Sequence, residues 1–575
     1  MLNTEANVEI LHRKLKDMYS PVCVLWYLLY IAYSNGSKTK VFIDTDNVIQ
    51  TIPDRFLSVT IDTAQIQANW ATLNFSFPKI QRLAEGLAPC YLRVGGSSAD
   101  FLQFNPGVQR ENNMKRSGDE YLKFRPYKKR NIPFEDTLEI QKLKNFTMSG
   151  KQWDELNHFV EVVGWDLIFD LNGLLRQDGL WLPDNAKLLM DYTSQKGYKI
   201  AGWELGNEPD AWTNIGYRIT ASQHAKDYRL LHTILNQYSQ WKNSTVIGPS
   251  TTGKPDVWRN LGYNINGSQH AADYRVLHSI LDQYPQWRNS LVIGPSVTMM
   301  SNIYTYMYLK DFLDAGGPDI VSHTTFHHYY GHGPDMTVAK FMDPKLLDSL
   351  KHQIKLAQGL APYPKYGKVW LGETSSAWGG GAAGLSDRYV AGFMWLDKLG
   401  VSASLGIEVV IRQDFYGNNY GLIDPKTLDP NPDLWSSFLF KILVGKSVLN
   451  VTIDDKSGNV RMYAHCTNTK RTNYKPGSIT LYGMNLRTEP TTVTFPQFKP
   501  DIKLYLYMLE PVGKEGLKSQ TVALNGKTLK VSPDLTMSQV TDIPEIVNGT
   551  FTFPQQSYGF IVISDANVAA CKNKV

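Results

Sequence analysis

The sequence predicts an α/β fold, a (β/α)8 TIM barrel followed by a C-terminal β-sandwich. Apolar strand-like runs alternate with helical patterns from about residue 56 to 445, which is the order of βα units around a parallel sheet. From about residue 446 the pattern changes to alternating strands and turns, which is typical of a sandwich. The 575 residues are 42 % hydrophobic and 20 % charged, which excludes collagen, coiled coil and wholesale disorder.

The first 37 residues are predicted to be a signal peptide or a signal anchor. The run 21–33 is uncharged, too short for the roughly 18–20 residues that span a bilayer, and typical of a secretory signal. The segment that precedes this run is longer and more acidic than the start of a usual signal peptide. An uncleaved anchor or a misplaced start codon is therefore also possible. We expect secretory entry, with glycosylation of surface loops at the N-x-S/T sequons. These begin at Asn35, Asn74, Asn145, Asn243, Asn266, Asn450 and Asn548.

Residues 53–445 are predicted to form the catalytic barrel, because eight strand-like runs fit a closed (β/α)8 sheet. The stretch 38–52 is also strand-like, and we expect it to join the β-sandwich of residues 446–575. The eight barrel runs are 57–62, 90–96, 165–171, 200–208, one copy of VIGPS (246–250 or 292–296), 319–330, 368–374 and 406–412.

One helix-and-strand unit is duplicated in tandem within residues 212–296. Residues 212–250 recur as 258–296, with 27 of 39 positions identical. Two copies are fewer than the roughly three that a solenoid needs, and a closed eight-stranded barrel has no place for a ninth strand. One copy is therefore expected to be surplus, either as a gene-model artefact or as an insertion extruded on the flank of the barrel. The second copy runs directly into the next strand, which makes the first the surplus one.

Two glutamates end predicted barrel strands. Glu208 follows Asn207 in WELGNEP after the fourth strand, and Glu373 lies in WLGETSSAWGGG at the end of the seventh. The carboxyl ends of barrel strands meet at one face, where barrel chemistry gathers. One rim glutamate alone is usually a solvated side chain. A pair is what a glycosidase needs, because one carboxyl protonates the leaving oxygen while the other attacks the anomeric carbon or activates water.

The motifs WELGNEP, HHYY, VWLGETSSAWGGG, AGFMWLDKLG and HCTN together resemble the heparanase family, glycoside hydrolase family 79 of clan A. The resemblance covers nearly the whole chain after the leader, apart from the repeat and a basic segment. It implies a retaining endo-β-glucuronidase that cleaves heparan sulfate and needs no cofactor, with Glu208 as acid/base and Glu373 as nucleophile. Retention requires the two carboxyl groups roughly 5–5.5 Å apart.

The resemblance also assigns the substrate contacts. Asn207 is expected to hydrogen-bond the sugar 2-hydroxyl. Ser97 stands where the family usually has Thr and keeps the hydroxyl. The residues implied to line the subsite that holds the glucuronate are Asp62, Ser97, Tyr329, Gly379, Gly380 and Tyr420.

Recognition of a sulfated polymer depends on Lys and Arg beside the cleft. Lys142 and Lys144 match the family's first basic cluster. The second cluster is depleted, because residues 296–311 contain only Lys310. That departure leaves an exo-acting β-glucuronidase of the same family as the alternative. A non-catalytic heparan sulfate-binding protein is a further alternative, since the repeat could disrupt the fifth strand.

Residues 106–141 form a polar segment rich in Lys and Arg, including RPYKKR at 125–130. By resemblance, a processing protease excises a linker here and leaves a heterodimer of the two cleavage products. An uncut surface loop is the alternative reading.

A heparan sulfate proteoglycan is the expected partner. The lysosome, the extracellular matrix, or both are compatible locations, with membrane anchorage through the leader left open.

Other residue classes are less informative. By resemblance Cys466 and Cys571 form a disulfide, while Cys90 is expected to be an inert buried thiol. The histidines at 323, 327 and 328 lack a zinc spacing, so we predict no metal site. A net charge of +5 is too mild to indicate a nucleic-acid partner. An acidic pH optimum is expected, because the acid/base must be protonated.

Overall fold

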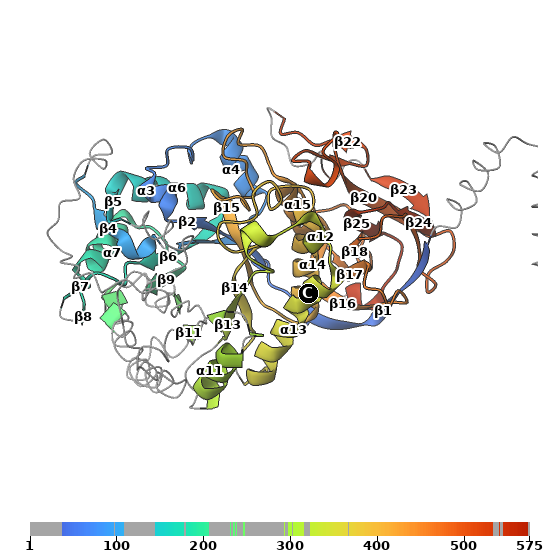
Figure 1. Ribbon diagram of the computed structural model, residues 1–575, viewed down its shortest axis with the longest axis horizontal. Coiled ribbons are helices and arrows are strands. Elements are labelled where there is room, and N and C mark those ends of the chain that lie inside the picture. The colour runs from blue at the N-terminus through green and yellow to red at the C-terminus, as the bar shows by residue number, and fades with distance from the viewer. Residues whose placement is uncertain are drawn as a thin grey trace, which may run out of the picture.

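The computed structural model describes residues 37–96, 98–108, 144–177, 180–205, 303–314, 323–365, 367–532 and 544–572, with short pieces between 230 and 301 and at 540. It contains a parallel sheet with surrounding helices and a separate, mostly antiparallel sheet domain (Figure 1). The predicted TIM barrel and C-terminal β-sandwich are therefore both found, with ten described strands in the barrel sheet where eight were expected.

Every neighbouring pair of strands in the barrel sheet is parallel. The path runs β11-β10-β9-β6-β3-β2-β15-β14-β13-β12. Its two ends, β11 and β12, are consecutive in the chain, so the sheet curls round on itself. The strands are β2 (Leu57–Asp62), β3 (Cys90–Gly95), β6 (Trp165–Leu171), β9 (Gly202–Leu205), β10 (Thr245–Ile247), β11 (Val292–Ile293), β12 (Val297–Thr298), β13 (Thr325–His328), β14 (Trp370–Thr374) and β15 (Val410–Tyr416).

The helices follow the strands, as βα units require. In α6, Ser149 and Gln152 form a reciprocal capping box at the start, and Gly164 ends the helix in the left-handed conformation. The helices are α3 (Ala64–Gln67), α4 (Pro78–Glu85), α6 (Gly150–Val163), α7 (Asp184–Lys196), α11 (Ile303–Asp314), α12 (Val338–Phe341), α13 (Pro344–Leu360), α14 (Ala391–Ser404) and α15 (Pro432–Leu443).

The duplicated unit departs from the sequence prediction. Strand β10 comes from the first copy and β11 from the second, and they pair side by side with Val246 opposite Val292. The expectation that the barrel sheet has no place for a ninth strand, and that the first copy is therefore surplus, is wrong for the described strands. Both copies carry the same β-branched pair, Val-Ile, and a parallel ladder accepts either.

The sheet domain begins with the N-terminal strand β1 (Ser37–Thr51). Val41 and its neighbours pair with β16, while the first four residues pair with β19. The expectation for residues 38–52 agrees with this pairing. The other strands are β16 (Val444–Ile453), β17 (Val460–Thr467), β18 (Ile479–Asn485), β19 (Thr491–Thr494), β20 (Lys503–Pro511), β21 (Val522–Leu524), β22 (Lys527–Thr528), β23 (Glu545–Asn548), β24 (Thr550–Phe553) and β25 (Ser557–Ile563).

Helix α14, which carries the AGFMWLDKLG motif, joins the two domains (Figure 1). A Cβ built on Gly392 would lie 2.2 Å from the Tyr558 ring, and one on Gly400 would lie 2.1 Å from the Tyr463 ring. Only glycine leaves room for these two tyrosines of the sheet domain. Asp397 of the same helix accepts hydrogen bonds from Arg461 and Tyr463. The motif is thus explained by packing between the domains.

Two short ladders lie outside the main sheets: β4 (Leu102–Asn105) pairs in parallel with β5 (Phe146–Ser149), and β7 (Arg176–Gln177) pairs with β8 (Leu180–Trp181). The basic segment 106–141 leaves from β4 and returns into β5, and most of it lies outside the described residues. Because β4 and β5 are hydrogen-bonded to each other, the two ends of this segment are held together.

Cys466 and Cys571 form a disulfide, and Cys90 is a buried free thiol whose pKa burial raises to about 11. Among the described residues, no helix has the length and apolarity needed to cross a bilayer. Asn74, Asn450 and Asn548 are exposed and Asn145 is half-buried, while Asn35, Asn243 and Asn266 lie outside the described residues.

Candidate active site

Glu373 lies at the carboxyl end of β14, where the barrel strands open to solvent. Its side chain is 12 % exposed, so it is mostly removed from water yet reachable. The Tyr329 hydroxyl donates to Oε1 at 2.7 Å, and the Arg93 guanidinium donates to Oε2 at 3.2 Å. Both carboxylate oxygens are therefore held in place by a hydrogen-bond donor.

The surroundings of Glu373 keep it ionised. Burial by itself would raise its pKa, because a charge is poorly solvated inside a protein. The electrostatic interactions with His327 and Arg93, together with the hydrogen bonds from Tyr329 and Arg93, outweigh burial and lower the pKa below the ordinary value for glutamate. An ionised, oriented carboxylate is the form that a nucleophile needs.

Strand register brings these groups together. His327 of β13 lies opposite Glu373 of β14, and Tyr329 follows β13 directly. Arg93 comes from β3 on another part of the sheet and is almost fully buried, with a side chain only 4 % exposed. Its other terminal nitrogen lies 4.0 Å from the buried Asp170 carboxylate at the end of β6. Arg93 thus lies between two buried carboxylates.

A buried lysine fixes the strand ends behind the nucleophile. The Lys398 ammonium, on α14, donates to the Ser375 carbonyl at 2.8 Å, to the Thr374 hydroxyl and to the His328 carbonyl at 3.3 Å. It also lies over the Tyr330 ring, 4.6 Å from the ring centroid. Burial lowers the pKa of Lys398 well below the ordinary value for lysine. This one ammonium joins the ends of β13 and β14, which carry Tyr329 and Glu373.

Asp62 lies at the end of β2, on the same face of the barrel as Glu373. Its Oδ1 accepts from the Ala64 backbone N–H at 2.8 Å. A Cβ on Gly96 would lie 2.7 Å from Asp62 Oδ2, and the φ of Gly96 is +105°, so only glycine is tolerated beside this carboxylate. Asp414 of β15 is buried, and burial, with a smaller contribution from the Asp62 charge, raises its pKa to about 7.

Tyr420 and the glycine-rich loop after β14 are also placed at this face. Tyr420 is buried, and its pKa is raised by burial first and then by the charges of Asp414, Glu373 and Asp62. Gly379 and Gly380 have φ of +78° and +79°, which favours glycine there. The Gly380 carbonyl accepts from the Asn419 N–H at 2.9 Å, so the loop is docked beside Tyr420.

The predicted site is only partly within the described residues. Those that the structure brings to one face are Asp62, Tyr329, Glu373, Gly379, Gly380 and Tyr420. Lys144 is exposed just before β5. Ser97, Lys142, Asn207 and Glu208 lie outside the described residues, so the separation of the two carboxyl groups stays a prediction.

Sequence reasoning missed Arg93, Asp170 and Lys398, and gave His327 no electrostatic role. A signal existed for Arg93, because an arginine inside the apolar run CYLRVGG needs a buried partner. The partner is 280 residues away in the chain, which a local pattern does not reveal. Within the described part of the chain, no group of three or more His, Cys, Asp or Glu could hold a metal ion.

Comparison with known proteins places these residues in a family. The family described as "Glycosyl hydrolase family 79, N-terminal domain" matches residues 38–261 and again 257–400. The second match starts where the second copy of the repeat begins. The chain is 37 % identical to a heparanase from Mus musculus, covering 92 % of this chain and 93 % of the relative. It is 32 % identical to a hyaluronoglucuronidase from Hirudo nipponia, covering 92 % and 99 %.

Solved structures agree on the fold. A 4-O-alpha-L-rhamnosyl-beta-D-glucuronidase from Fusarium oxysporum is similar with a TM-score of 0.54 and 14 % identity, covering 91 % of this chain and 99 % of that one. A GH51 arabinofuranosidase from Xanthomonas axonopodis pv. citri has a TM-score of 0.55 and 11 % identity, covering 92 % and 99 %. The family match, with the relatives' identity over most of both chains, shows that this chain is a glycoside hydrolase and belongs to glycoside hydrolase family 79.

Proposed function

We propose that the protein is a retaining endo-β-glucuronidase that cleaves β-glucuronidic linkages within heparan sulfate. The observation that carries this proposal is the ionised Glu373, held by Tyr329 and Arg93 at the open end of the barrel. Relatives named heparanase at 36–37 % identity support the choice of polymer.

The reaction needs two steps. In the first, a Glu373 oxygen attacks the anomeric carbon while the Glu208 carboxyl donates its proton to the departing glycosidic oxygen. In the second, the Glu208 carboxylate takes a proton from water, whose oxygen attacks the same carbon and releases Glu373. Asn207 contacts the 2-hydroxyl. The lowered pKa of Glu373 supports the nucleophile role, since the acid/base must instead hold a proton.

Substrate contacts follow the residues at the same face. The glucuronate is held by Asp62, Ser97, Tyr329, Gly379, Gly380 and Tyr420. Lys142 and Lys144 contact sulfate groups on one side of the cleft. The exposure of Lys144 is compatible with that role.

One observation favours a second candidate, an exo-acting or less sulfate-dependent β-glucuronidase. Lys310, the only basic residue of 296–311, forms an ion pair with Asp314. A cation already paired on its own helix offers less to a sulfated polymer. The similarity to a hyaluronoglucuronidase is compatible with weaker dependence on sulfate.

The test is the size of fluorescent heparan sulfate after incubation near pH 5, measured by size-exclusion chromatography beside Glu373→Gln. Shortening to oligosaccharides that is lost in the variant is expected. Release of monosaccharide glucuronate from an unshortened polymer would favour the exo candidate. Binding without either product would favour a non-catalytic protein, and a variant lacking residues 212–257 would then show whether the repeat blocks turnover.

Maturation is a separate proposal. We propose that the leader directs the chain into the secretory pathway, that exposed sequons such as Asn74 and Asn450 are glycosylated, and that a protease excises part of 106–141. The β4–β5 pairing supports the last step, because it would keep the two products joined as a heterodimer. Lysosome and extracellular matrix are the proposed locations. Intact-mass analysis of the secreted protein, before and after deglycosylation and reduction, tests all three steps.

A further inference from the structure

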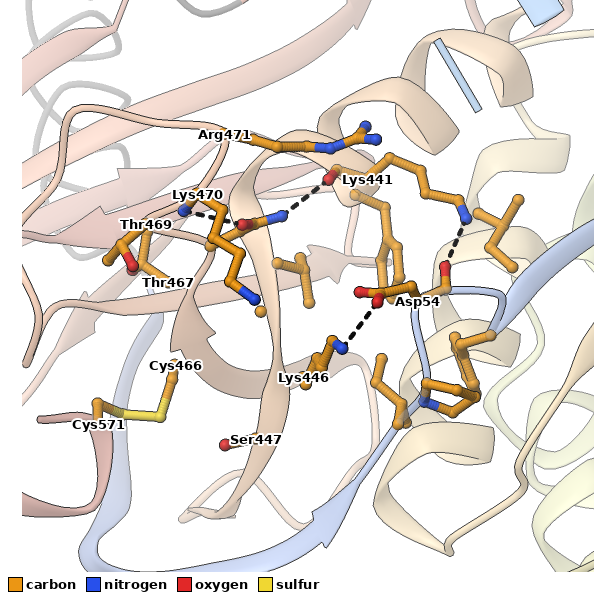
Figure 2. A pocket seen from close by; sticks show the side chains of 18 of the residues that line it. Asp54, Lys441, Lys446, Ser447, Cys466, Thr467, Thr469, Lys470, Arg471 and Cys571 are labelled. Carbon is orange, nitrogen blue, oxygen red and sulfur yellow. Dashed lines mark hydrogen bonds and ion pairs between the residues drawn. A yellow bond between two sulfur atoms is a disulfide. The ribbon is translucent and has the colours of Figure 1, made fainter. Parts of the chain in front are cut away.

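A basic pocket of about 530 Å³ lies at the opposite end of the barrel from Glu373. It is lined by the segment before β2, by the end of α15 and the start of β16, by the loop after β17, and by the C-terminal tail (Figure 2). Asp54 and Pro89 of its wall precede the first residues of β2 and β3, whereas the active site lies where these strands end. Strand β2 alone spans about 20 Å between the two ends.

The charge of the pocket is strongly one-sided. Its lining contains one acidic side chain, Asp54, and five basic ones. Asp54 is already paired with Lys446 at 2.7 Å. Within the described part of the chain, neither Lys470 nor Lys572 has an ion-pair partner. The basic lining residues are Lys441, Lys446, Lys470, Arg471 and Lys572.

Hydrogen bonds within the protein hold the walls of the pocket in place. The buried Lys441 ammonium donates to the Asp54 carbonyl at 2.9 Å (Figure 2). It also donates to the Pro89 carbonyl at 2.7 Å. The Asn468 amide donates to the Lys441 carbonyl at 3.2 Å, which fixes the loop that carries Lys470. A preformed wall reduces the ordering that a ligand must induce on binding.

The disulfide positions Lys572 at the pocket. Cys571 lines the pocket and is bonded to Cys466, so the tail with Lys572 is tied to the edge of the pocket. Ser447, Thr467 and Thr469 also line the pocket (Figure 2). A cavity lined by several cations and by side chains that carry hydroxyls suits a ligand that carries several separated anionic groups and hydroxyls. A volume of this size lies within the range of small-ligand sites.

We propose that this pocket binds a short sulfated segment of a glycosaminoglycan chain, as a second site separate from the catalytic cleft. The choice of ligand rests on the proposed function, which supplies a polymer of this chemistry. Sulfate groups would be contacted by Lys470 and Lys572 at the rim, with Arg471 and Lys446 beside them. A polymer held here would raise the local concentration of cleavable linkages at the other end of the barrel without taking part in the reaction.

Lysine footprinting tests the site directly. The full chain with Glu373→Gln, which cannot turn over substrate, is acetylated with and without a sulfated heparan tetrasaccharide, and each lysine is followed by mass spectrometry. Lys470 and Lys572 are expected to be protected, whereas the exposed Lys499 and Lys503 of the sheet domain are not. No protection of the pocket lysines at saturating tetrasaccharide would overturn the proposal. Equal protection by inorganic sulfate at the same ionic strength would also overturn it, since the pocket would then be a simple anion site.

A matched pair of variants measures the consequence. Lys470→Gln with Lys572→Gln removes two exposed charges, and Lys499→Gln with Lys503→Gln removes the same charge elsewhere on the sheet domain. We expect the first pair to raise KM for long heparan sulfate about threefold or more with kcat unchanged, and the second pair to have no effect. An equal effect of both pairs would refute a localised site.

The two proposals fail in different ways. Protection of Lys470 and Lys572 without polymer shortening by the wild-type protein would leave the pocket standing and reject the endo-glucuronidase activity. Shortening without protection would do the reverse.

Discussion

Replacing Tyr329 by Phe tests whether the surroundings of Glu373 set its ionisation. The Tyr329 hydroxyl donates to Glu373 Oε1 at 2.7 Å, and this bond helps to lower the pKa of the carboxyl. A hydrogen bond to a charged group contributes about 1.5–3 kcal/mol, and one pKa unit corresponds to about 1.36 kcal/mol. Tyr329→Phe should therefore raise the pKa of Glu373, because the variant loses this hydrogen bond to the charged form.

The assay is the pH dependence of kcat/KM on heparan sulfate, which reports the ionisations of the free enzyme. Because the nucleophile must be ionised, a higher pKa moves the acidic limb of the profile upward and activity is lost first at low pH. The same sign holds for stability. A carboxyl with a lowered folded-state pKa stabilises the fold above its unfolded pKa and loses this contribution as pH falls through the folded pKa. Tyr329→Phe should reduce stability at neutral pH, with a smaller difference in acid.

A control with the same chemistry exists elsewhere in the barrel. The Tyr198 hydroxyl donates to the Asp154 carboxylate at 2.9 Å, away from the strand ends of the site. Tyr198→Phe should leave the acidic limb where it is. An unmoved limb in Tyr329→Phe, or an equal shift in both variants, would refute the reasoning.

Three further predictions concern the buried framework. Arg93→Leu leaves Glu373 buried without its cation and should lower the free energy of unfolding in urea by about 3–5 kcal/mol, with partial recovery in Arg93→Lys; an unchanged urea midpoint would contradict this. Lys398→Met leaves several buried acceptors unpaired, so we expect a loss of about 1–3 kcal/mol by urea titration and a fall in kcat with little change in KM; a change in KM alone would argue against a positioning role. Joint replacement of Cys466 and Cys571 by Ser should cost about 2–4 kcal/mol and lower the calorimetric Tm with kcat preserved, and lost activity in the folded variant would show a wider role.

Most of the domain organisation could be predicted from local patterns. Alternating apolar runs indicated the barrel strands, and the change of period near residue 446 indicated the sheet domain. The repeat could be recognised in the sequence, but the pairing of strands from both copies could not be predicted. Sequence identity of the two copies predicts a surplus, whereas pairing of β10 with β11 depends on whether the curled sheet accepts one more strand.

The amino-acid sequence by itself determined that two carboxylates follow apolar strands and that Glu373 ends one of them. The reason is that the end of a strand can be predicted from the local pattern of apolar and polar residues. Only the tertiary structure decided that Arg93, 280 residues earlier, donates to that carboxylate. It also decided that Lys398 is buried behind it. Five separate segments of the chain form the basic pocket in the same way. The physical reason is that ionisation depends on desolvation and on neighbouring charges, and both are set by which distant segments pack together.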